Sequence, residues 1–177
     1  MEAAWEIYQR LKHRAKERQL TQQQAQQRPL NKSENAIVQK ALRESTLDEG
    51  AIGAFVGSAG VAGTAWDIGA HTVIFFGTAE ETARSARLVA EECSRLWEWL
   101  GVNRPFRLIL WWRDAPRRIK ATEWPSRLTV NGGWTYQNSS AIFVYRSEEW
   151  DRVFLHEMIH ALGWDWEMPE KPLACWK

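Results

Sequence analysis

Cysteine is scarce in this sequence, and its scarcity excludes one class of protein. Only Cys93 and Cys175 occur among 177 residues, too few for the disulfide framework of a small secreted protein. The first residues also lack the charged-then-apolar pattern and the small-residue cleavage site of a signal peptide. We therefore expect an intracellular, soluble protein.

Charge of one sign and membrane-length hydrophobic runs are missing as well. Lys and Arg total 23 against 22 Asp and Glu, so the formal net charge of +1 gives no general attraction to nucleic acid or to an anionic membrane. The uncharged run Ala51–Trp66 has 16 residues and is rich in glycine, whereas a membrane-spanning helix needs roughly 20 apolar residues. We expect no membrane segment, and nucleic acid is not the expected partner.

Short apolar segments predict a sheet. The runs are rich in strand-forming residues, and a periodic helix separates the first two of them, which leaves a crossover long enough for parallel pairing. The expected helix is Ala79–Leu100, and the expected strands are His71–Gly77, Phe106–Trp112, Gly133–Gln137 and Ala141–Arg146. We therefore predict an α+β fold with a small mixed, twisted sheet and a backing helix.

Composition divides the chain into three expected parts. Residues 1–34 read as an amphipathic helix and a Gln-rich linker, an N-terminal helical extension. Residues 35–68 read as a short helix, Asn35–Arg43, and a connection in which the glycines of Gly50–Gly63 disfavour both helix and strand. Residues 69–177 hold the predicted sheet and are expected to form the main domain.

A helix is expected after the last strand. Ser147 is a suitable N-cap, and acidic residues, Asp151 among them, follow in the first turn, where the helix dipole favours negative charge. From Val153 to Leu162 every residue except His156, Glu157 and His160 is apolar. We therefore expect this helix to be buried.

Three polar residues on this helix form a candidate metal site. His156 and His160 are four residues apart and lie on one helix face, and Glu157 projects beside them. Zn²⁺ accepts imidazole nitrogens in tetrahedral geometry and leaves a position for water, which Glu157 is placed to deprotonate as a general base. The alternative is a chance motif in a structural helix whose polar groups have other buried partners. We expect His13 and His71 to be surface or satisfied histidines.

At His156-Glu157-Met158-Ile159-His160 the chain resembles the zincin metallopeptidases. That resemblance covers roughly residues 70–166 and implies a twisted sheet, a backing helix and an active-site helix. It also implies zinc-dependent hydrolysis of peptide or protein substrates. The segments 131–136, 142–146 and 155–157 are similar to uncharacterised metallopeptidase-like proteins of large DNA viruses.

The zincin resemblance also implies a binding mode for an extended peptide. The strand before the active helix is expected to offer an edge to which the peptide adds. Trp134, Tyr136 and Tyr145 are then candidate pocket walls or hydrogen-bond donors, and aromatic packing is the alternative for each of them.

The third zinc ligand departs from the zincin pattern. Trp166 occupies the position where metzincins have their third ligand, and Asp165 lies one residue earlier. We take Asp165 as the candidate, with Glu167, Glu170 or a residue beyond Lys177 as alternatives. Because the ligand set is incomplete, the alternative function is a non-catalytic, degenerate or truncated zincin-like binding module.

A basic cluster supports a third functional hypothesis. Arg113, Arg117, Arg118 and Lys120 follow two tryptophans and can combine phosphate contacts with base stacking. Such a cluster is more often a solvated loop, so nucleic-acid binding is the least favoured hypothesis.

Overall fold

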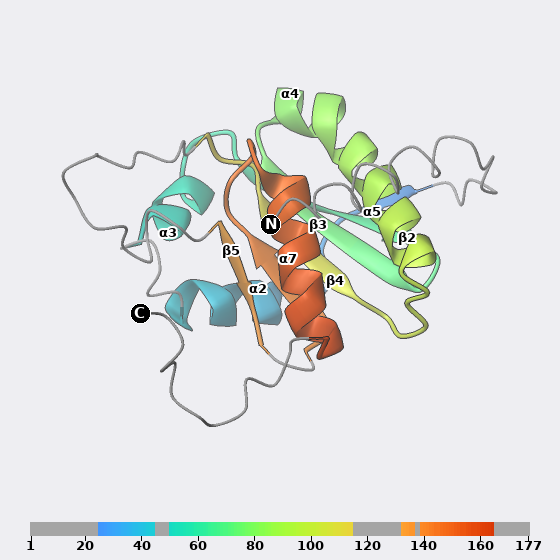
Figure 1. Cartoon of the computed structure of the whole chain (residues 1–177). Helices are drawn as coiled ribbons and strands as arrows, with labels where there is room; N and C mark the ends of the chain where they lie inside the picture. The colour runs from blue at the N-terminus through green and yellow to red at the C-terminus, as the bar shows by residue number, and fades with distance from the viewer. Residues whose placement is uncertain (1–24, 45–49, 115–131, 137–138, 165–177) are drawn as a thin grey trace, which may run out of the picture.

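The structure is a computed structural model of the whole chain, and it describes residues 25–44, 50–114, 132–136 and 139–164. Its centre is a six-stranded mixed sheet in the order β1-β2-β3-β4-β6-β5 (Figure 1). Strands β3, β4 and β6 are parallel, and the other neighbours pair antiparallel. The strands are β1 Gln26–Arg28, β2 Ala62–Ile68, β3 His71–Gly77, β4 Arg107–Trp111, β5 Gly133–Thr135 and β6 Ala141–Val144.

Helices cover both faces of the sheet, so the described part of the chain has three layers. One face packs against α2 (Lys32–Glu44) and α3 (Ala51–Val56). The other packs against α5 (Arg87–Trp99) and α7 (Trp150–Leu162). Figure 1 shows α7 crossing the sheet between β5 and α5. The predicted mixed α+β architecture is confirmed at this level.

The inner strands are apolar at nearly every position because both of their faces are buried. In β4, Leu108 and Leu110 point into the core under α5 and α7, whereas Ile109 and Trp111 point into the core under α2 and α3. This pattern is typical of parallel strands covered on both sides. It explains why the expected strands match β3 in both bounds and differ from β4 by one residue at each end.

The expected helix Ala79–Leu100 is confirmed as three contiguous elements, α4 (Ala79–Glu81), the π-helical turn η1 (Thr82–Ala86) and α5. Its first turn is closed by a capping box, in which Thr78 and Glu81 bond each other's backbone N–H groups. Its buried side is formed by Ala86, Val89, Ala90, Cys93 and Trp97, whereas Leu88 is 64% exposed.

The expected domain boundaries do not separate structural units. Strand β2 comes from the segment expected to be a connection, and it pairs with β3 along its whole length. Strand β1, expected in a linker, pairs with β2. Despite its glycines, the segment Gly50–Gly63 contains α3 and the start of β2. The sheet therefore crosses both boundaries, at 34/35 and 68/69; the N-terminal helix expected before residue 25 lies outside the described residues.

A charged network fastens the N-terminal part of the described chain to the sheet. Arg28 bonds Glu34 in α2 through both carboxylate oxygens, at 2.6 and 2.8 Å, and also bonds Asp67 in β2. The Asn31 backbone N–H donates to Glu34 and the Thr72 hydroxyl to Asp67. Hydrogen bonding from Arg28 lowers the pKa of both carboxyl groups. The network joins β1, α2 and β2 into one unit.

Among the described residues, no helix is both long and apolar enough to cross a bilayer.

Candidate metal centre

The motif lies on α7, which follows β6 after a five-residue connection, 145–149. The expected N-cap is wrong, because the helix begins at Trp150 and Glu149 holds the cap position without a side-chain cap bond. Ser147 instead donates its hydroxyl and its backbone N–H to the carbonyl oxygen of Arg113, just after β4. The Ser147 contact therefore fixes the connection, and of the expected acidic residues only Asp151 lies in the first helical turn.

The expectation of an all-round buried helix is also wrong. The buried residues of α7 face the sheet and α5; they are Val153, Phe154, Glu157, Met158 and Ala161. His156 is exposed, His160 is half-buried and Ile159 is 38% exposed. The described part of the chain therefore leaves the histidine side of the helix accessible.

The two histidines turn toward each other. Their Nε2 atoms are 3.0 Å apart, and their rings are nearly perpendicular, with centroids 4.6 Å apart and an interplanar angle of 88°. Two imidazole nitrogens that each lie about 2.0–2.1 Å from one tetrahedral zinc ion are about 3.4 Å from each other. The separation between His156 and His160 is close to that value, so the pair fits two ligands of one ion.

Glu157 lies on the sheltered side of this pair. It is 7% exposed and is one of three buried charged residues in the described part of the chain. Because successive helical residues are rotated by about 100°, its side chain projects beside His156 and His160 rather than away from them. A carboxylate held in this position, away from bulk water, is suited to accept a proton from a reactant at the histidines.

Two glycines bring α7 close to the edge strand β5. A Cβ atom on Gly132 would lie 2.6 Å from Cγ2 of Val153, on the first half of α7. A Cβ atom on Gly133 would lie 2.7 Å from Cγ1 of Val153 and 2.4 Å from the carbonyl oxygen of Phe143. These distances are shorter than any ordinary contact. The two glycines are therefore needed for strand and helix to approach each other.

The edge expected next to the motif belongs to a different strand. Strand β6 precedes the motif helix but is paired on both sides, whereas β5 is terminal among the described strands. Tyr145 N–H donates to Gly132 O at 2.9 Å, and hydrogen-bonded pairs alternate along an antiparallel ladder. Gly132 and Tyr145 thus form one hydrogen-bonded pair, and Trp134 and Phe143 form the next. Gly133 and Thr135, which lie between and after these pairs, direct their backbone N–H and C=O groups away from β6.

Two of the three aromatic candidates lie on the wrong face. Trp134 stacks on Phe143, with ring centroids 4.8 Å apart, and on Trp111 at 5.7 Å. Tyr145 is buried in the same cluster, under α2 and α3 and across the sheet from α7. Aromatic packing is thus the role of Trp134 and Tyr145. Tyr136 is 54% exposed and stays a candidate.

No third metal ligand is found among the described residues. Within them, no three His, Cys, Asp or Glu side chains are grouped so as to hold a metal ion. The candidates Asp165, Glu167 and Glu170 lie outside the described residues.

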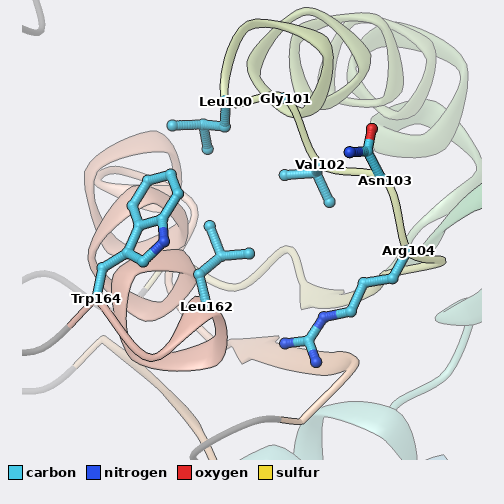
Figure 2. Close-up of a pocket in the computed structure, with 7 residues that line it drawn as sticks. All are labelled: Leu100, Gly101, Val102, Asn103, Arg104, Leu162 and Trp164. Atoms are coloured by element: carbon cyan, nitrogen blue, oxygen red, sulfur yellow. The ribbon is translucent and has the colours of Figure 1, made fainter.

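A surface hollow lies at the other side of α7. It has a volume of about 370 Å³ and lies between the end of α7 and the connection from α5 to β4 (Figure 2). Leu162 and Trp164 line it from the α7 side. Leu162 is two residues beyond His160, a rotation of about 200° around the helix, so the hollow does not adjoin the histidine pair.

His71 is a satisfied histidine, as the sequence predicts. Its ring stacks on Trp97, with centroids 4.5 Å apart, and its Nδ1 accepts a hydrogen bond from the backbone N–H of Phe106 at 3.2 Å. Nδ1 must be unprotonated to accept this bond. Burial lowers the pKa of His71 below its ordinary value of 6.5.

His71 should therefore make stability depend on pH. As the pH falls through about 6.5 the unfolded chain binds a proton at this ring before the folded chain does, so the free energy of unfolding decreases. His71→Asn keeps an acceptor but cannot titrate. Urea unfolding at pH 7.5 and pH 5.5 should show a larger loss of stability in the wild type than in the variant; equal losses would contradict this account.

The basic cluster is only partly described. The Arg113 guanidinium lies 5.9 Å from the centroid of the Tyr145 ring, a cation–π arrangement within the protein. Arg117, Arg118 and Lys120 lie outside the described residues.

Comparisons with protein-family models, with curated proteins and with solved structures found no match to this chain.

Proposed function

We propose that this chain is a zinc-dependent metallopeptidase, with His156 and His160 as zinc ligands and Glu157 as the general base. The observation that carries the proposal is the convergence of the two histidine Nε2 atoms to 3.0 Å on the helix that also bears the buried Glu157. When bound, zinc supplies a Lewis acid that polarises a peptide carbonyl and lowers the pKa of water toward neutrality. Glu157 takes the proton from the attacking water and passes it to the leaving amine.

The surroundings of the pair support a peptide as the substrate. The outward backbone groups of Gly133 and Thr135 on β5 are suited to pair with an extended chain. Val153 brings β5 against the first half of α7, one turn before His156. A peptide added to this edge would run alongside the histidine side of the helix. The zincin resemblance agrees with this arrangement, because α5 backs the sheet and α7 carries the motif directly after β6.

A non-catalytic binding module is the second candidate function. One observation favours it: the described residues supply two ligands, whereas catalytic zinc sites have three. The same 3.0 Å separation also fits a hydrogen bond between two neutral imidazoles. Peptide turnover by the zinc-loaded protein distinguishes the two functions.

The test is the zinc content of the purified 177-residue protein after reconstitution with Zn²⁺, measured by elemental mass spectrometry. We expect one zinc ion per chain in the wild type. His156→Ala and His160→Ala should each lose it, because removing a ligand weakens binding by more than the roughly 10–100-fold typical of an outer-shell partner. His71→Asn is the matched control and should keep its zinc.

Asp165→Asn, Glu167→Gln and Glu170→Gln identify the third ligand, since only one of them should reduce zinc affinity strongly. A wild-type chain without zinc after reconstitution, or one whose zinc survives both histidine substitutions, would rule out the proposed centre. Zinc binding without turnover on a broad peptide library would favour the binding module.

A further inference from the structure

The end of α7 is closed by three separate hydrogen bonds. Gly163 is in the left-handed region, with φ of 68°, and its N–H donates to the carbonyl oxygen of His160 at 3.0 Å. Trp164 N–H donates to the carbonyl oxygen of Ile159 at 3.0 Å. Both bonds satisfy carbonyl groups that a helix end leaves without helical partners. The next carbonyl, of Ala161, needs a donor from elsewhere in the chain.

Arg104 provides that donor. Its Nη2 donates to the carbonyl oxygen of Ala161 and, at 3.4 Å, to the carbonyl oxygen of Ser139 just before β6. Its guanidinium also lies 4.8 Å from the centroid of the Phe106 ring, which is fully buried. Figure 2 shows this side chain reaching from the connection after α5 toward the end of α7. A positive charge at this position is also favoured by the helix dipole.

These contacts join the last turn of α7 to two fixed parts of the sheet. Ser139 lies just before β6 and Phe106 just before β4. Arg104 therefore attaches the end of α7 to the amino ends of two inner strands of the sheet. His160 directly precedes Ala161, and helix ends otherwise fray. His156 lies one turn earlier, where the buried side of α7 already packs on the sheet. His160 is therefore the member of the pair whose place depends on the anchoring of the helix end.

We propose that Arg104 is a positioning residue that holds the last turn of α7, so that His160 stays in place to bind a metal ion together with His156. The inference rests on the proposed function, in which these histidines are zinc ligands. Arg104 itself touches neither the metal nor the substrate in this account. It acts through the Ala161 carbonyl.

The experiment compares the full chain with Arg104→Ala and Arg104→Lys. Zinc affinity is measured by competition with a chromophoric chelator, and the absorption bands of the Co²⁺-loaded protein report ligand geometry. Hydrogen exchange of the 158–164 segment reports the helix end without any metal. Val38→Ala is the control, because it removes buried apolar volume from α2 on the opposite face of the sheet.

We expect Arg104→Ala to bind zinc about tenfold more weakly, to change the Co²⁺ bands and to exchange faster at Gly163 and Trp164. Arg104→Lys, which keeps a charged donor, should recover part of each change, and it decides the question if the alanine variant does not fold. Val38→Ala should lower thermal stability and leave zinc affinity unchanged. If the wild type binds zinc and Arg104→Ala binds it with equal affinity, this inference is overturned but the proposed function is not. A wild type that binds neither ion would overturn the proposed function and this inference together.

Discussion

Glu157→Gln is expected to lower the rate of peptide hydrolysis by about 10²–10⁴-fold, the range typical for loss of a general acid or base. Gln has nearly the same shape as Glu, so the packing of this 7%-exposed side chain should be preserved. The glutamine amide, however, cannot accept a proton at neutral pH. The variant should therefore keep zinc and thermal stability close to those of the wild type while kcat falls.

The measurement is steady-state cleavage of a fluorogenic peptide library, with zinc content determined on the same samples. Asp151→Asn is a suitable control, because Asp151 lies six residues earlier on the same helix and away from the motif. It should retain the wild-type kcat. Undiminished hydrolysis by Glu157→Gln would show that another group takes the proton.

Gly133→Ala is expected to be the most destabilising single methyl addition in the described part of the chain. The added Cβ would lie 2.4 Å from the backbone oxygen of Phe143 and 2.7 Å from a methyl group of Val153. Overpacking of a core typically costs about 1–3 kcal/mol, and occasionally more. A cost at the upper end is expected here, because a strand backbone cannot move aside as a side chain can. Chemical denaturation of the variant and the wild type gives the difference directly.

Val153→Ala provides an internal test of this explanation. For Gly132 the close contact is the Val153 side chain, so the double variant Gly132→Ala/Val153→Ala should show favourable coupling of about 1 kcal/mol or more in a double-mutant cycle. For Gly133 the backbone clash with Phe143 remains, so Val153→Ala should rescue Gly133→Ala only in part.

Gly53 supplies the matched control. It lies inside α3 with nothing within 4 Å of an added Cβ, so Gly53→Ala should stabilise the protein by about 0.5–1 kcal/mol. Equal effects of alanine at Gly53 and Gly133 would mean that the approach of β5 to α7 does not depend on glycine.

The elements that the sequence predicts well are those specified by local apolar pattern. The strand His71–Gly77 and the motif helix are examples, because burial on both faces or on one side leaves a continuous signal in a few neighbouring residues. Strand β2 has a weaker signal: Gly63 and Thr64 lie within it, and its place in the sheet depends on pairing with β3. The pairing of β1 and β2 into the sheet, across the expected boundaries, has no local signal for the same reason.

At the site, the sequence identifies His156, Glu157 and His160 through their spacing, and helix geometry makes the meeting of the two histidines predictable. The sequence does not show which side of the sheet Trp134 faces, because an isolated three-residue strand has no internal reference for its two faces. The need for Gly132 and Gly133 is also hidden, since the residue that they approach, Val153, lies 21 and 20 positions away from them along the chain. Long-range contacts of this kind leave no local pattern.

The seven residue pairs between β2 and β3 determine at which residue a shortened expression fragment can begin. A fragment that began at residue 69 would leave β3 as a bare edge, and Ile74 and Phe76 would lose the cover of α2 and α3. Long apolar edges recruit further copies of the same strand and lead to aggregation. An expression fragment for assays should therefore start before β1, so that the outer strands continue to shield the sheet from self-association.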